Sequence, residues 1–152
     1  MLFLAGCATA RKNNFPPAVP AVSTSSPWES PFISGFEKAL FRTSLQIRDF
    51  TLSGITLVKK SSDSSFRVVM TSEIGMTFFD IELRDAKFIP HYIFAPLNYR
   101  PVKKILEENF RVLLLPQTIA QKVSPSIDKQ TGSIEISNHN CRFHLTLSPL
   151  NR

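Results

Sequence analysis

The sequence predicts a mainly β, α+β fold: a curved antiparallel sheet, shaped as an unclosed half-barrel and covered by one amphipathic helix. Two observations lead to this prediction. Apolar and polar residues alternate in short segments between residues 52 and 94, and residues 101–114 then change to helical spacing. Period-two segments joined by short turns form antiparallel neighbours, because parallel pairing needs longer crossovers. A one-sided sheet and a one-sided helix bury their apolar faces against each other.

Four segments carry the strand pattern: 52–60, 65–72, 76–84 and 86–94. The third is the clearest, because its apolar face opposes a mainly charged one: Phe79, Ile81 and Leu83 against Phe78, Asp80, Glu82 and Arg84. Such alternation is typical of an antiparallel sheet that is wet on one side. Pro90 has no N–H to donate, so it places the fourth segment at a sheet edge or in a bulge.

The first two segments have shared faces as well: Ile55 with Leu57, and Phe66 with Val68 and Met70. The turn at residues 61–65 is a run of serines around one aspartate, and the next turn contains Gly75. Glycine accepts positive φ without steric cost, so we expect Gly75 to adopt it.

Residues 101–114 predict the helix. Its apolar residues fall at helical spacing, with lysines and glutamates on the other side: Val102, Ile105, Leu106, Phe110 and Leu113 against Lys103, Lys104, Glu107 and Glu108. Pro101 suits a first helical turn, and Pro116 ends the element. Residues 35–41 are predicted as a further short helix, and residues 133–137 and 141–150 as a closing hairpin.

Composition and motifs disfavour several classes of function. The chain has 152 residues, a net charge of +6 and 13 phenylalanines, which predicts one domain with a substantial core. Its basic residues are scattered and form no stripe with stacking aromatics, so we do not expect nucleic-acid binding. No Gly-rich phosphate loop or serine nucleophile motif occurs. Asp80 and Glu82 could act as paired catalytic carboxylates, but two acids on a polar strand face are more typical of a solvated charge stripe. We therefore expect no enzyme and no cofactor.

Three side chains near the end of the chain suggest a metal site only at first sight. His139, Cys141 and His144 are close in sequence. On a strand, however, Cys141 and His144 point to opposite faces, so the three do not converge as metal binding requires. We expect no metal ion there.

The N-terminus has the character of a lipoprotein. Leu4-Ala5-Gly6-Cys7 reads like a lipobox, although only six residues precede the cysteine. We interpret residues 1–7 as a truncated signal, residues 8–33 as a Pro/Ser-rich tether and residues 34–152 as the domain. A disordered tail is the alternative for the tether. Cys7 is then acylated, the alternatives being a disulfide with Cys141 or two inert thiols. No apolar run reaches the length of about 18–20 residues that spans a bilayer.

The stretch from Phe66 to Thr77 resembles the LolB-like outer-membrane lipoprotein receptors, which share a superfamily with the LolA-like periplasmic carriers. The shared pattern is an aromatic residue and Arg, three apolar residues, Thr, two variable residues, an apolar residue, Gly, a variable residue and Thr. Pro96-Leu97-Asn98 and the Leu115-Pro116 helix end are similar too. The match covers roughly residues 45–116.

The resemblance implies an unclosed, strongly curved sheet whose apolar concave side receives the acyl chains of lipoproteins. Eight residues are then expected to line the cavity: Phe66, Val68, Phe79, Ile81, Leu83, Ile105, Leu106 and Phe110. It also implies a monomer anchored by Cys7 at the periplasmic face of the outer membrane, with lipoproteins or a periplasmic carrier as partners. The family's receptor carries a protruding apolar loop, for which Ile74 is the candidate here.

The residues themselves leave a second function open. The same apolar pattern serves a cavity or a packed core, because both need apolar side chains on one face. The alternative is an envelope lipoprotein with a packed core and a structural or protein-docking role.

Overall fold

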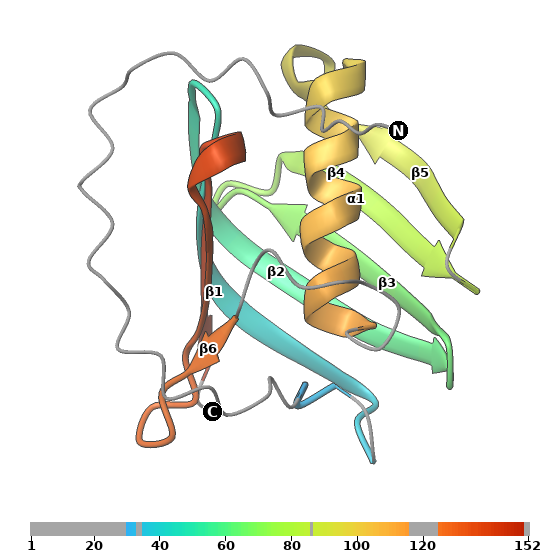
Figure 1. Ribbon diagram of the computed structural model, residues 1–152, viewed down its shortest axis with the longest axis vertical. Coiled ribbons are helices and arrows are strands. Elements are labelled where there is room, and N and C mark those ends of the chain that lie inside the picture. Colours follow the sequence, from blue (N-terminus) through green and yellow to red (C-terminus); the bar gives the residue numbers. More distant parts are fainter. Residues whose placement is uncertain (1–29, 33–34, 86, 116–124, 151–152) are drawn as a thin grey trace.

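The computed structural model of the chain describes residues 30–32, 35–85, 87–115 and 125–150 (Figure 1). The fold of these residues is α+β and mainly β, with one α-helix and an antiparallel sheet of eight strands that does not close. The strands are β1 (Lys38–Ile47), β2 (Phe50–Ser62), β3 (Ser65–Thr71), β4 (Thr77–Arg84), β5 (Lys87–Ile93), β6 (Ser126–Ile127), β7 (Ile134–Asn138) and β8 (Phe143–Pro149). The helices are α1 (Arg100–Leu114) and the 3-10 turns η1 (Ala95–Leu97) and η3 (His139–Cys141).

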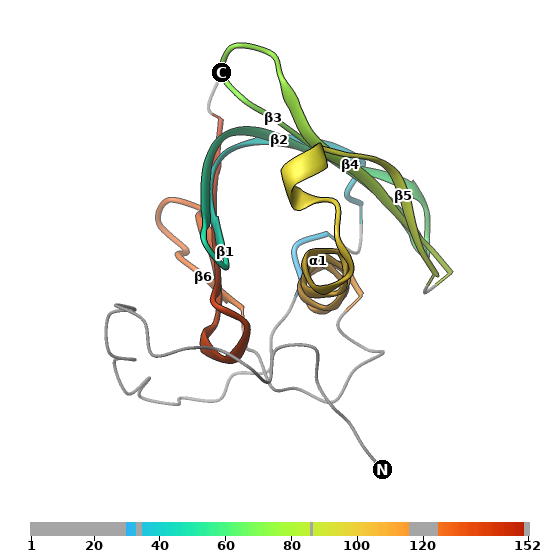
Figure 2. The same cartoon turned by 90° about the horizontal axis from the view of Figure 1, so that it is seen from above.

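The strands lie in the order β5-β4-β3-β2-β1-β8-β7-β6. The first five therefore form a meander, and the last three add to its β1 side. β1 pairs with β2 over its whole length and with β8 from Phe41, opposite Pro149, to Ile47, opposite Phe143. Figure 2 shows the resulting sheet as a deep curve with α1 inside it.

Two devices allow the sheet to curve. Gly54 in β2 has no side chain, and a Cβ atom there would lie 1.9 Å from the carbonyl oxygen of Thr71. The register also shifts between β2 and β3, between β3 and β4, and between β4 and β5. Such irregularities bend a strand and increase its local twist.

α1 begins after Tyr99, with Pro101 in the first turn where a missing N–H costs nothing. Glu107 and Arg111 form an ion pair of 2.8 Å one turn apart on the helix. The buried residues of α1 are Val102, Ile105, Leu106, Asn109, Phe110, Val112, Leu113 and Leu114. The predicted apolar stripe is thus confirmed, and the helix starts one residue earlier than expected.

One apolar cluster joins the concave side of the strands to α1. The ring centroids of Phe79 on β4 and Phe110 on α1 lie 5.8 Å apart in an edge-to-face arrangement. Ser30 Oγ donates a 2.9 Å hydrogen bond to the carbonyl oxygen of Leu113, and Phe32 packs on Phe41. The packing of the domain therefore includes residues 30–32, which the sequence assigned to the tether.

The expected helix at residues 35–41 is wrong, because β1 begins at Lys38. Pairing with strands on both sides overrides the weak local helical spacing there. Other local predictions are confirmed. Gly75 has a φ of 91°, β5 is an edge strand with a register shift beside Pro90, and β7 and β8 form the closing hairpin.

Candidate functional site

The eight residues predicted to line a cavity come from three elements. Phe66 and Val68 lie on β3, and the others lie on β4 and α1: Phe79, Ile81, Leu83, Ile105, Leu106 and Phe110. Each is at most 1% exposed, and all belong to the same apolar cluster. Two-residue periodicity on the strands and helical periodicity on α1 therefore bring them together at one place.

The contact between α1 and the strands is apolar. Among the described residues, no hydrogen bond or ion pair joins α1 to a strand. Apolar contacts are non-directional and depend on the area removed from water, so other apolar groups of similar shape can replace them. The concave side is thus suited chemically to aliphatic chains.

A few polar side chains are buried on the concave side of the strands or on the apolar face of α1. Thr43 on β1 and Thr56 on β2 bond to each other through their hydroxyls at 2.7 Å. Asn109 on α1 is 1% exposed; its Nδ2 donates to the Ile105 carbonyl oxygen at 2.7 Å, and its Oδ1 has no hydrogen-bond partner. The sequence reasoning missed Asn109, although its position one turn from both Ile105 and Leu113 was a usable signal.

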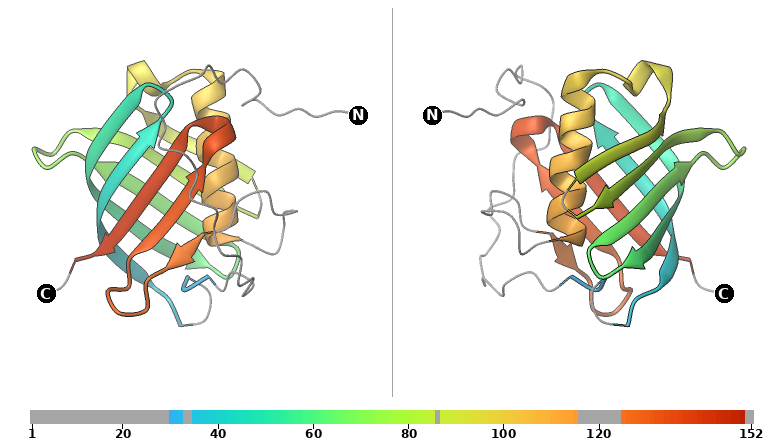
Figure 3. Two further views of the ribbon diagram at one scale, coloured as in Figure 1. Left: turned by 60° about the vertical axis from the view of Figure 1, so that its left-hand side comes forward. Right: turned by 90° about the vertical axis from the view of Figure 1, so that its right-hand side faces the viewer.

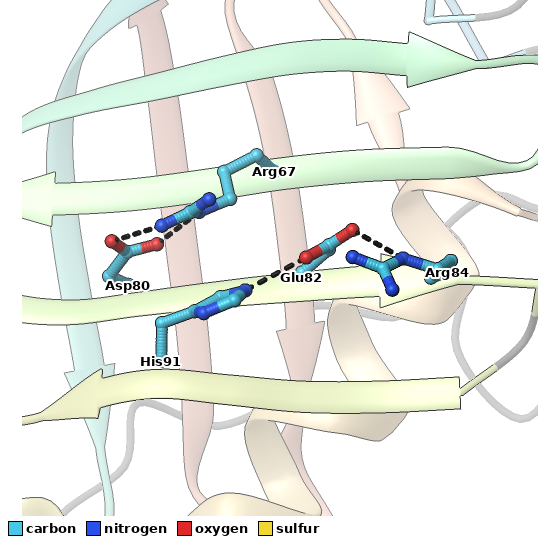
Figure 4. Close-up of polar contacts among 5 residues, drawn as sticks. All are labelled: Arg67, Asp80, Glu82, Arg84 and His91. Carbon is cyan, nitrogen blue, oxygen red and sulfur yellow. Dashed lines mark hydrogen bonds and ion pairs between the residues drawn. The ribbon is translucent and has the colours of Figure 1, made fainter.

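The convex side of β3, β4 and β5 carries a polar network (Figure 4). Arg67 donates from Nε and Nη2 to the two carboxylate oxygens of Asp80, at 2.6 and 2.8 Å. Glu82 accepts from Arg84 Nε at 2.9 Å and bonds His91 Nε2 at 2.8 Å. The contacts of Arg67 with Asp80 and of His91 with Glu82 join neighbouring strands, whereas Arg84 and Glu82 lie on the same strand. The prediction of a solvated charge stripe is wrong for Glu82, which is buried.

Glu82 is the most buried acid of this network, with a side chain only 8% exposed. The pKa of its carboxyl is lowered, first by the hydrogen bond with His91 and then by that with Arg84, while burial opposes the shift. His91 reaches it because of a bulge: Ile81 pairs with Pro90 and Asp80 pairs with Tyr92, so His91 is the extra residue. The sequence predicted the irregularity at Pro90 but not the pairing.

A groove of about 380 Å³ lies along the charged side of α1. Its lining alternates basic and acidic side chains: Arg100, Lys103, Lys104, Glu107, Glu108 and Arg111. Such a lining is unsuited to an aliphatic chain, because each charge would lose water without gaining a partner. The groove therefore differs from the surface of α1 that packs on the strands: its lining is charged, whereas that surface is apolar.

The turn between β3 and β4 presents apolar side chains to solvent. Ile74 is 91% exposed and Met76 is 41% exposed. Figure 3 shows this turn projecting from the sheet. The serine-rich turn between β2 and β3 has no such residue, as the sequence indicated.

The residue proposed for anchoring lies outside the structure's described residues, and the cysteine considered and rejected as a metal ligand lies within them. Cys7 and the segment 8–29 lie outside the described residues. Cys141 is buried in η3, and its sulfur takes part in a disulfide bond. No cluster of three metal-ligating side chains occurs among the residues that the structure describes. None of the described helices has the length and apolar character needed to cross a bilayer.

No protein-family model, curated protein or solved structure matches the chain.

Proposed function

We propose that this chain is a lipid-anchored envelope protein that binds an acyl chain, or the acyl chains of a lipoprotein, between the concave side of its sheet and α1. In this proposal α1 is the cover of the concave face and moves to admit the chain. One observation carries the proposal: eight apolar residues named from the resemblance to LolB-like receptors meet at one contact beneath an unclosed sheet.

The energetics of exchange support a movable cover. Each methylene group removed from water contributes about 0.8 kcal/mol, so a twelve-carbon chain offers on the order of 9 kcal/mol before the costs of binding. Lifting α1 loses apolar contacts of the same kind and breaks no hydrogen bond to a strand among the described residues. An acyl chain can therefore replace side-chain contacts by contacts of equal chemistry.

The anchor belongs to the same proposal. Acylation of Cys7, followed by the tether, places the domain at the periplasmic face of the outer membrane, where it receives lipoproteins from a periplasmic carrier. The chain has two cysteines, so the disulfide described for Cys141 and a diacylglyceryl thioether on Cys7 exclude each other within one chain. The intact mass of the protein, expressed behind a complete lipoprotein signal in a Gram-negative host, distinguishes them: acylation adds the mass of the lipid, and a disulfide removes two hydrogens.

The main test uses the full chain and an uncharged dye with a twelve-carbon acyl chain, 6-dodecanoyl-2-dimethylaminonaphthalene. Native mass spectrometry of the purified protein first reports any lipid that it retains. We expect saturable dye binding at one molecule per chain, displaced by retained lipid. Leu106→Ala should weaken binding about tenfold, since it removes apolar contact at the site. Leu40→Ala is the matched control, because Leu40 is 49% exposed on the convex side.

A second function is favoured by a specific observation, the complete burial of all eight residues. It is an anchored envelope protein whose packed core supports a docking surface. Under this function Leu106→Ala should lower the free energy of unfolding by about 2–5 kcal/mol. The parent protein should not bind the dye. A parent protein that binds no dye and retains no lipid would therefore replace the first proposal by the second.

A further inference from the structure

Among the described residues, a buried polar atom on the apolar face of α1 points to a ligand. Three other buried polar side chains are hydrogen-bonded: Thr43 bonds Thr56, Ser30 bonds the Leu113 carbonyl, and Glu82 bonds Arg84 and His91. The Oδ1 atom of Asn109 has no hydrogen-bond partner, although its residue is 1% exposed. A buried carbonyl oxygen without a donor loses its water and gains nothing, which makes such atoms rare in folded proteins.

The position of Asn109 on α1 places it within the proposed acyl site. Residues three and four apart share a helix face, so Asn109 lies with Ile105, Leu106 and Leu113. All three neighbours are at most 1% exposed and belong to the apolar cluster. Apolar residues at the same position would extend the stripe without penalty. The amide therefore stands near the middle of the face that the proposed acyl chain would touch.

The chemistry of the amide specifies a complementary group. Oδ1 accepts a hydrogen bond, and Nδ2 carries two hydrogens, of which one is donated to the Ile105 carbonyl. A ligand amide placed here would donate its N–H to Oδ1 and accept the second Nδ2 hydrogen on its carbonyl oxygen. An ester of the same length has no donor, and would leave Oδ1 unpaired.

A charged head group fits poorly at this place. The buried face of α1 carries no lysine or arginine, and its basic residues line the opposite groove. A carboxylate beside Asn109 would lose its hydration without a cation to replace it. A neutral head group avoids this cost.

We propose that Asn109 is the polar contact for the head of the bound chain, and that the site prefers neutral acyl chains linked through an amide over esters and free carboxylates. This inference rests on the proposed function and names its ligand class. Asn109 is then a binding residue that selects the linkage, while the eight apolar residues bind the chain.

The test compares dodecanamide, methyl dodecanoate and dodecanoate as competitors of the acyl dye, with the full chain and with Asn109→Leu. In the parent, dodecanamide should bind about tenfold more tightly than the ester, because it makes one additional buried hydrogen bond. Asn109→Leu should abolish this preference, weaken amide binding more than ester binding, and raise the melting temperature because the unpaired acceptor is gone. Thr43→Val is the control, because it alters a buried polar group that is already paired.

Three results would overturn the inference. Equal binding of amide and ester by the parent, or an equal loss of both in Asn109→Leu, would show that Asn109 does not select the linkage. A lower melting temperature in Asn109→Leu would show that the amide is satisfied in the free protein. If the parent binds no acyl dye at all, the proposed function itself fails. Should Asn109→Leu not fold, the amide-to-ester ratio of the parent alone decides.

Discussion

The two faces of the same strands differ in how their side chains hold together. On the concave side, Phe66, Val68 and Phe79 belong to an apolar cluster. Apolar packing has no preferred direction, so aliphatic groups of suitable shape can take part in it. On the convex side, Arg67 and Glu82 make hydrogen bonds whose geometry is fixed. The polar network therefore fixes the register of β3, β4 and β5 from outside. The difference teaches that polar contacts on one face can hold neighbouring strands together while the other face packs without specific hydrogen bonds; under the proposed function, only that second face would exchange partners.

The largest expected effect comes from the concave side. Phe79→Ala should lower the free energy of unfolding by about 3–5 kcal/mol, because it opens a void beside Phe110 in a fully buried cluster. Urea unfolding followed by circular dichroism measures the loss. A loss below about 1 kcal/mol would show that this face is not packed in solution, and the contrast between the faces would fail.

The next effect comes from the centre of the convex network. Glu82→Gln should cost about 1–3 kcal/mol near pH 7, since it removes the charge that His91 and Arg84 share. Urea midpoints of parent and variant give this difference. Arg84→Gln serves as the control and should cost less, because it removes a half-exposed partner and leaves the buried Glu82 with its contact to His91.

The same carboxyl predicts how stability depends on pH. Its pKa in the folded protein is lowered from 4.5, so the unfolded chain binds the proton more readily. The stabilisation is therefore present above pH 4.5 and is lost as the pH falls through the folded value. The gap between parent and Glu82→Gln should close progressively in that range. A gap that stays constant through acid would contradict the lowered pKa.

A smaller effect is expected for the pair Arg67 and Asp80. Their side chains are 39% and 22% exposed, so solvent and salt screen the attraction. A double-mutant cycle with Arg67→Leu and Asp80→Leu should give a coupling of about 0.5–1 kcal/mol that declines in high salt. A coupling that does not respond to salt would mean that the pair is effectively buried.

The smallest effect on stability belongs to the β3–β4 turn. Ile74→Ser should change the free energy of unfolding by less than about 0.5 kcal/mol, because the side chain is 91% exposed. Under the proposed function it should nevertheless slow transfer of the acyl dye from protein to vesicles. Glu73→Ser in the same turn is the control, and equal transfer rates for both variants would remove Ile74 from the mechanism.

Much of the fold could be predicted where local patterns are strong. β4 and α1 show clear two-residue and helical periods, and the eight apolar residues follow from those periods together with the resemblance. β1 was missed because polar Thr43 interrupts its inward face of Phe41, Leu45 and Ile47. The pairing of β1 with β8 leaves no local trace in the sequence. Nor does the alignment of His91 with Glu82, which depends on a bulge.

The place of β1 in the sheet has a consequence for how the chain folds. β2 follows β1 at once, but β8 pairs with β1 only about a hundred residues later, as with Phe41 and Pro149. During synthesis, one side of β1 therefore keeps its backbone N–H and C=O groups open until the last strand arrives. Long-range pairing of this kind makes folding slow, and an open strand invites pairing with other chains. A chain shortened before β8 would expose the long strand β1, which lies inside the complete sheet, as an open edge available for aggregation.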